Sequence, residues 1–181
     1  LGLTINLSVN ASPSSLQSDD FADSILALLI AYNMPAENLC IEVTENILAR
    51  DDAQELATIN RLNMRGVKIA LDDFGKGYSS LSYLKNFPAD VLKIDKAFIQ
   101  HLAKDKRDSA IVESLVDLSH KLGIKVVAEG VEEKQQLAKL KKIGCDLIQG
   151  FYYAKPMPKL EFEEFVAHQF NLAHGDKRAN Q

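Results

Sequence analysis

Short apolar runs and longer helical patterns alternate along the chain. The first run has apolar residues at positions 3, 5, 7 and 9, the period of two that is typical of a strand, and it ends near Asn10. Later apolar runs predict five more strands, at 39–43, 67–71, 91–94, 124–128 and 146–149. Elsewhere apolar residues recur every three or four positions, which indicates helices. These helical patterns cover 18–32, 56–62, 81–84, 111–122, 137–143 and 160–170.

This alternation predicts an α/β fold, because a helix between two strands returns the chain so that the strands run parallel. Two architectures compete: an open doubly wound sheet, and an eight-unit barrel that normally needs about 250 residues. Polar residues recur at the carboxyl end of every predicted strand, and only a closed ring points all those ends at one mouth. We therefore expect a TIM-like (βα)8 barrel that is N-terminally incomplete, with six units visible and two, roughly 60 residues, missing.

The polar residues at the strand ends are mostly acids. They are Asn10, Glu42, Asp72 with Asp73, Lys93, Glu129 and Gln149. Each alone has an ordinary structural explanation, such as a turn for the paired aspartates or a lysine that reaches solvent from a half-buried strand. Gathered at one mouth, the carboxylates would repel one another unless positive charge lay among them. Oxygen ligands without histidine or cysteine favour Mg²⁺ or Mn²⁺.

The adjacent aspartates indicate a site for two metal ions, because their side chains diverge and one carboxylate can bridge both ions. Two such ions activate a water and neutralise a phosphoryl oxygen, so phosphodiester hydrolysis is the reaction class that fits best. Lys93 would orient the attacking water and offset negative charge in the transition state. A second interpretation is an enolase-like barrel, in which Lys93 removes a proton beside a carboxylate-bound Mg²⁺.

Composition narrows the range of partners and locations. The 181 residues are 46% hydrophobic and 25% charged, which suits one globular domain, here 1–170, with a tail at 171–181. Lys plus Arg 21 against Asp plus Glu 25 gives a net charge of −4, which argues against binding to duplex nucleic acid. The sequence shows neither a membrane span nor a signal peptide, so we expect no membrane contact by this chain. Cys40 and Cys145 indicate buried thiols in a reducing compartment.

Six motifs give the sequence a family resemblance. They are VNAS at 9–12, IEVTE at 41–45, LDDFGKGYSSL at 71–81, LKIDKAFI at 92–99, VVAEGVE at 126–132 and QGFYYAKPMP at 149–158. In this order they resemble the EAL-type cyclic-di-GMP phosphodiesterases of bacterial signalling over nearly the whole chain. The resemblance implies a (βα)8-like barrel that opens cyclic-di-GMP to linear pGpG with two Mg²⁺ or Mn²⁺ ions.

The resemblance also implies roles for individual residues. The metal ligands would be Asn10, Glu42, Asp72, Asp73 and Glu129, with Asp72 shared between the two ions. The catalytic residues would be Lys93, Glu129 and Asp73, with Gln149 and Glu132 positioning substrate or water and Glu45 anchoring the DFGKGYSSL loop. Asn6, in the string INLS, is the alternative to Asn10, and we prefer Asn10 because it lies at the strand end.

The chain departs from the family in one respect. It contains neither a Glu-Ala-Leu tripeptide nor the Arg-Trp that usually follows it, so a metal-binding glutamate and a phosphate-binding arginine are absent from these residues. This agrees with the two missing units, and activity is expected of the intact domain, while that of the 181 residues alone stays open. The alternative to an enzyme is a catalytically inactive receptor that binds cyclic-di-GMP.

Partners and location also follow from the resemblance. Members of the family often come after a sensor or cyclase domain and tend to form dimers. We therefore expect a homodimer and an N-terminal sensor or cyclase domain in the parent protein. A cytoplasmic location is expected for this chain, whether or not the parent is attached to a membrane.

Overall fold

The structure is a computed structural model that describes residues 5–50, 52–76 and 84–175. The chain divides into two compact units. The larger unit ends at Tyr153 and holds a six-stranded sheet, and the smaller unit begins at Ala154 and holds the last helix, α9 (Lys159–Gly175). This helix extends beyond the predicted range of 160–170 at both ends.

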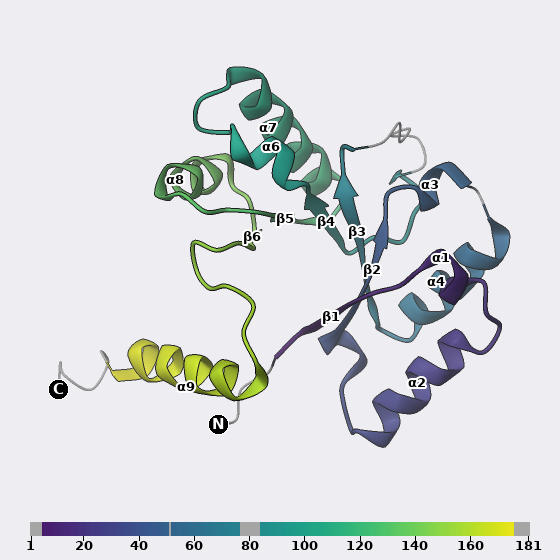
Figure 1. Cartoon of the computed structure of the whole chain (residues 1–181). Coiled ribbons are helices and arrows are strands. Elements are labelled where there is room, and N and C mark those ends of the chain that lie inside the picture. The colour runs from purple at the N-terminus through teal and green to yellow at the C-terminus, as the bar shows by residue number, and fades with distance from the viewer. Residues whose placement is uncertain (1–4, 51, 77–83, 176–181) are drawn as a thin grey trace. The chain divides into compact units, whose positions relative to one another are not determined.

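The strands of the sheet pair in the order in which they occur in the chain. They are β1 (Leu7–Asn10), β2 (Leu39–Thr44), β3 (Lys68–Phe74), β4 (Val91–Ile94), β5 (Lys125–Ala128) and β6 (Leu147–Ile148). Every pairing is parallel. The sheet curls into a half-barrel with β1 and β6 at its two edges (Figure 1). The predicted α/β class and the incomplete TIM-like barrel are thereby confirmed.

Helices connect the successive strands. In chain order they are α1 (Pro13–Leu16), α2 (Phe21–Ala31), the 3-10 helix η1 (Ala36–Asn38), α3 (Ile47–Arg50), α4 (Ala53–Met64), α6 (Lys96–Gln100), α7 (Lys106–Lys121) and α8 (Lys134–Ile143). The Asp52 side chain caps α4 by accepting from two backbone amides of its first turn. Gly144 ends α8 in the left-handed conformation, with φ of 89°. The helices α1, α3 and α6 were not predicted, because they are too short to show a helical period. The helix predicted at 81–84 falls mostly outside the described residues.

The two faces of the sheet differ in polarity, since alternate residues of a strand point to opposite sides. The face toward the helices carries Ile41, Ile69, Leu71, Leu92, Ile94 and Val126, which are buried in one core with residues of α4, α7 and α8. The opposite, concave face carries mainly polar residues and lines a cavity. Apolar burial under the helices thus fixes which residues of each strand face the barrel interior.

Helix α7 is buried most deeply along a line of residues next to the stripe that the sequence pattern marks. The apolar stripe of this helix is Ile111, Leu115, Leu118 and Leu122, and its first and last members are exposed. The buried positions are Ser109, Val112, Val116 and Ser119. These smaller side chains allow the helix to pack closely on the sheet.

The described residues also bear on the environment of the chain. None of the helices in this part of the chain combines the length and the apolar content that a membrane span needs. The thiols of Cys40 and Cys145 are free and only half-buried, less than the sequence suggested. Burial raises the pKa of each thiol to about 11, so both are protonated at neutral pH.

Candidate active site

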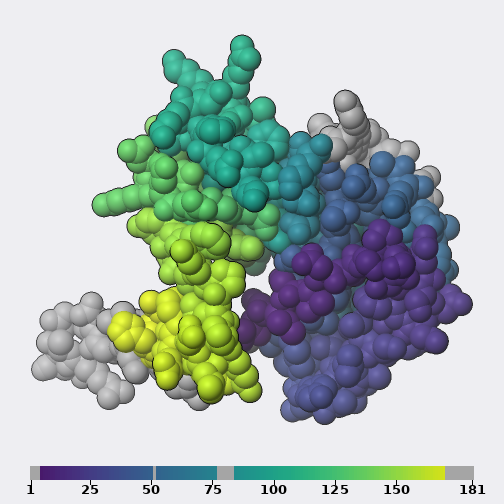
Figure 2. All heavy atoms as spheres, viewed as in Figure 1, coloured from purple at the N-terminus to yellow at the C-terminus, as the bar shows by residue number. Residues whose placement is uncertain are grey.

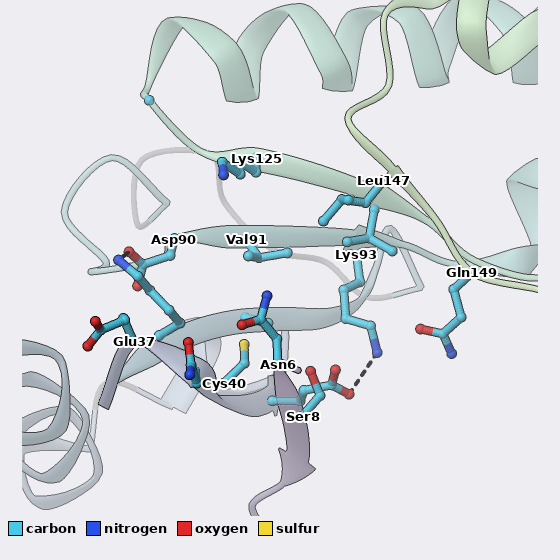
Figure 3. Close-up of a pocket in the computed structure, with 16 residues that line it drawn as sticks. Asn6, Ser8, Glu37, Cys40, Asp90, Val91, Lys93, Lys125, Leu147 and Gln149 are labelled. Atoms are coloured by element: carbon cyan, nitrogen blue, oxygen red, sulfur yellow. Dashed lines mark hydrogen bonds and ion pairs between the residues drawn. The ribbon is translucent and has the colours of Figure 1, made fainter. Parts of the chain in front are cut away.

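The carboxyl ends of the strands meet at one rim of the half-barrel. In the parallel register Asn10, the last residue of β1, lies beside Glu42 of β2. The concave face below the rim encloses a cavity of about 460 Å³, and Glu42, Lys93 and Gln149 are among its lining residues. Figure 3 shows Lys93, on β4, and Gln149, just after β6, at the same end of this cavity. Residues far apart in the sequence therefore reach one site.

Lys93 forms the centre of this site. Its side chain is 6% exposed, and its Nζ lies 2.7 Å from Glu42 Oε2, 2.7 Å from Glu129 Oε1 and 3.1 Å from Asp72 Oδ1. Glu42 lies on β2, Asp72 lies on β3, and Glu129 is the residue that follows β5. The curvature of the sheet thus brings three strand ends around one ammonium group.

The charges in this cluster do not balance. Three carboxylates against one ammonium leave two negative charges in a largely buried site. Burial alone would lower the pKa of Lys93, but its hydrogen bonds to Glu129 and Glu42 outweigh burial and raise that pKa above the usual value. Burial raises the pKa of Glu129, Lys93 opposes this rise, and the charges of Asp72 and Glu42 add to it. The acids therefore remain short of positive charge.

Asp73 adds a further carboxylate to the rim. One oxygen each from Asp72, Asp73 and Glu129 lie within 4.8 Å of one another. The pairing of β3 with β4 is irregular between Leu71 and Phe74, and Asp73 has a φ of 57°, which is unusual for a residue with a side chain. A regular strand would point adjacent aspartates to opposite faces, whereas this irregularity lets both reach the rim. The Asp73 amide donates to Asp72 Oδ1 at 2.9 Å.

These donors fit a divalent cation. The group consists of carboxylate oxygens and contains neither histidine nor cysteine, and its excess of negative charge matches an ion of charge +2. The amide of Asn10 offers another oxygen at the neighbouring strand end. Oxygen ligands of this kind suit Mg²⁺ and Mn²⁺ alike, so the donor set does not choose between them.

Glu45 links two loops at the rim. It is 3% exposed, its amide donates to Asp72 O at 3.1 Å, and its Oε2 accepts from the Gly75 amide at 2.9 Å. These bonds join the segment after β2 to the end of β3 and the turn that follows. The remainder of the predicted DFGKGYSSL loop, residues 77–81, lies outside the described residues.

Three other predicted residues occupy different positions relative to the acids. Gln149 lines the cavity. Asn10 is exposed at the end of β1, and Asn6, on the same face of the chain, lines the cavity further from the rim. Glu132 is exposed, and its amide donates to Gln136 Oε1 at 2.8 Å. Within 5–50, 52–76 and 84–175, no hydrogen bond or ion pair joins the Glu132 side chain to the acidic cluster.

The sequence pattern missed two residues at the rim: Lys76, which pairs with Asp73, and Asp95, which pairs with Lys76. Lys76 Nζ lies 2.7 Å from Asp73 Oδ1 and 2.8 Å from Asp95 Oδ2. Asp95 is 2% exposed and caps α6 by accepting from the Ala97 amide. Both residues lie inside motifs quoted above, but a lysine in a glycine-rich loop and an aspartate before a helix are usually explained by solvation and capping.

Comparisons with known proteins identify the family of the chain. The model of the EAL domain family matches residues 2–156. The chain is 40% identical over 167 residues to the cyclic di-GMP phosphodiesterase RocR of Pseudomonas aeruginosa, covering 92% of this chain and 43% of RocR. The chain thus spans less than half the length of this curated relative.

Solved structures show the same fold. A PaMucR phosphodiesterase in complex with c-di-GMP superposes with a TM-score of 0.81 at 42% identity, covering 87% of this chain and 64% of that chain. A manganese/cy-diGMP complex of Klebsiella pneumoniae BlrP1 superposes with a TM-score of 0.80 at 35% identity, covering 84% of this chain and 39% of that chain.

Proposed function

The chain belongs to the EAL domain family, and on this premise we propose that it hydrolyses cyclic-di-GMP to linear pGpG with divalent metal ions, as part of a complete domain. The observation that carries the proposal is the buried ammonium of Lys93, which contacts three carboxylates where the strands end. These four groups together keep an excess of negative charge that metal ions would balance. The names of RocR and MucR as phosphodiesterases support the reaction class.

The acids and the amide at the rim would hold two ions. We assign Asn10, Glu42 and Asp72 to one ion, Asp72 and Asp73 to the second, and Glu129 to a metal or its water. When bound, such ions make a water molecule nucleophilic at neutral pH and neutralise a phosphoryl oxygen. The grouping of Asp72, Asp73 and Glu129 within 4.8 Å supports this assignment.

Lys93 would act as a hydrogen-bond donor. Its contacts with Glu42, Asp72 and Glu129 keep the ammonium fixed among the metal-binding acids, where it can orient the attacking water and offset charge in the transition state. A lysine that removes a proton in an enolase-like reaction must first lose its own, and three surrounding carboxylates oppose that loss. The geometry therefore favours hydrolysis over proton abstraction.

Gln149, Glu132 and Glu45 would assist from around the rim. Gln149 points into the same cavity as Lys93, which suits a contact to substrate or to a bound water (Figure 3). Glu45 would fix the turn after β3 through its hydrogen bond from Gly75. Glu132 would position water or substrate only if its exposed side chain turns toward the acids.

The complete domain requires more strands than the six described here. We propose that the edges β1 and β6 are joined by further strands that bring the glutamate of the family's Glu-Ala-Leu motif, with the domain continuing to residue 170 and a tail at 171–181. The shares of RocR and MucR that the chain leaves uncovered support this proposal. A homodimer and an N-terminal sensor or cyclase domain are part of the same proposal. The free thiols support a reducing, cytoplasmic location.

The test is the formation of pGpG from cyclic-di-GMP by the full-length protein, followed by chromatography. We expect product with Mg²⁺ or Mn²⁺, none with a chelator, and at least a hundredfold slower reaction in Lys93→Ala. Lys68→Ala is the matched control, because Lys68 lines the same cavity but pairs with Asp90 at 2.8 Å, outside the acidic cluster. Absence of product above the Lys93→Ala background would refute hydrolysis, and tight nucleotide binding without turnover would identify the receptor.

A further inference from the structure

Lys76 places a positive charge on one of the candidate metal ligands. Its ammonium lies 2.7 Å from Asp73 Oδ1 and 2.8 Å from Asp95 Oδ2, so it bridges the two carboxylates. Asp73 is one of the two carboxylates assigned to the second ion, and it belongs to the group of three acids at the rim. An ammonium and a metal ion therefore share one carboxylate.

The local backbone holds Lys76 in this position. Asp73 has a left-handed φ of 57°, and the Lys76 amide donates to Asp73 O at 3.3 Å, which closes a turn. Gly75 lies inside the turn with φ of 105°, and a Cβ there would meet the Phe98 ring at 2.5 Å. The Gly75 amide is bound by Glu45. The turn, packed on α6 and tied to the segment after β2, aims the lysine back at Asp73.

We propose that Lys76 is a built-in competitor for the second metal position, which holds Asp73 when that position is empty and lowers the affinity of the site for the ion. The inference rests on the proposed function and concerns the regulation of the same site. It gives this chain a way to set the metal concentration at which the second position fills.

Asp95 makes the competition reversible. It is a nearly fully buried carboxylate at the start of α6, and it keeps a hydrogen bond from the Ala97 amide besides its ion pair with Lys76. When a metal ion takes Asp73, the ammonium can remain on Asp95 and need not be left unpaired. Hydrogen bonds to Asp73 and Asp95 raise the pKa of Lys76, so the competitor is charged at neutral pH.

The size of the effect follows from the charges. An ammonium and a divalent ion about 5 Å apart repel each other, even at the dielectric constant of water, by an amount that corresponds to roughly ten- to twentyfold in affinity. Mn²⁺ alone is the probe, and binding to the full-length protein is followed by calorimetry and by the spin-resonance signal of free Mn²⁺. We expect Lys76→Met to bind one of two ions about tenfold more tightly, while Lys76→Arg, which keeps the charge, resembles the wild type.

The control removes an equivalent surface lysine far from the rim. Lys121→Met also deletes an ammonium from an ion pair, here with Asp117 at 2.6 Å on α7, and should leave Mn²⁺ affinity unchanged. Asp95→Asn keeps the helix cap but removes the second carboxylate, so it should weaken Mn²⁺ binding roughly threefold by placing Lys76 entirely on Asp73. In a Lys76→Met background the same substitution should have a smaller effect, because only the direct attraction between the Asp95 carboxylate and the ion is then lost.

The outcomes separate this inference from the proposed function. If the wild type binds Mn²⁺ and Asp72→Asn weakens that binding at least tenfold, but Lys76→Met and Lys76→Gln both bind like the wild type, then Lys76 does not compete and only this inference is wrong. If the wild type binds no Mn²⁺, the metal assignment is wrong and the inference with it. Tighter binding by Lys76→Met with an unchanged Lys121→Met supports the inference.

Discussion

Replacing Lys93 by methionine tests the electrostatic account of the site most directly. Methionine is similar in length to the lysine stem but carries no charge. The change leaves Glu42, Asp72 and Glu129 without the ammonium that now lies 2.7 to 3.1 Å from their oxygens. The number of unbalanced negative charges among these four groups rises from two to three.

The expected cost can be estimated from the burial of these groups. Removing one partner of a buried ion pair costs about 3 to 5 kcal/mol, and protonation of Glu129, whose pKa is already raised, will relieve part of this. We therefore expect a loss of about 3 kcal/mol in the free energy of unfolding, or about 6 to 12 °C in Tm for a domain of this size. Because the variant site is more negative, Mn²⁺ should raise the Tm of the variant more than that of the wild type.

The assay is thermal unfolding followed by circular dichroism, with and without Mn²⁺. Lys68→Met is the control, because Lys68 pairs with Asp90 on the same concave face but is 45% exposed, so its ion pair should contribute less than about 1 kcal/mol. Equal losses of Tm in the two variants, or an equal effect of Mn²⁺ on Lys93→Met and the wild type, would refute the account.

Three further predictions concern the metal, the turn and the far end of the sheet. Asp72→Asn should weaken Mn²⁺ binding at least tenfold by calorimetry, and unchanged affinity would remove Asp72 from the ligand set. Gly75→Ala should lower the free energy of unfolding by about 2 kcal/mol or more, because a side chain there is strained by the left-handed backbone and also overlaps Phe98. Gly123→Ala has the same backbone strain but open space around its Cβ, so it should lower the free energy by only about 1 kcal/mol. Denaturant unfolding of the two variants measures this difference. Burial would raise the pKa of Asp146, but hydrogen bonds from His120 and a backbone amide lower it, so Asp146→Ala should be less stable than the wild type at pH 7. The difference in stability between the wild type and Asp146→Ala should shrink as the pH falls below about 4, because the Asp146 carboxylate is then protonated in the wild type. A difference in Tm that stays constant over this pH range would contradict the prediction.

Several features of this protein were predictable from sequence because they depend on local order along the chain. Alternation of strands and helices gives parallel neighbours, and parallel neighbours put all carboxyl ends at one rim. Residues such as Glu42, Lys93 and Glu129 follow from this topology, since the first two lie near the carboxyl ends of β2 and β4 and Glu129 comes directly after β5. Their convergence needed no knowledge of side-chain contacts.

For helix α7, the sequence pattern alone did not identify the residues that are buried most deeply. Helix α7 carries an apolar stripe, yet it buries the neighbouring face with Val112 and Val116. Periodicity reports that a face is apolar but not which face fits a given sheet, because fit depends on side-chain size at the contact. The orientation of Glu132 is likewise not encoded in its motif: in the structure its side chain is exposed, and its backbone amide donates to Gln136 of α8.

Sequence thus determined the fold class, the order of the strands and the chemical nature of the rim. Tertiary structure decided which charges meet: that Lys93 touches three acids, that an irregularity in β3 turns Asp73 to the rim, and that Lys76 bridges Asp73 and Asp95. The physical reason is that ion pairs form over a few ångströms, a distance fixed by strand curvature, a bulge and a turn. These depend on the packing of the whole sheet, and spacing along the chain does not encode them.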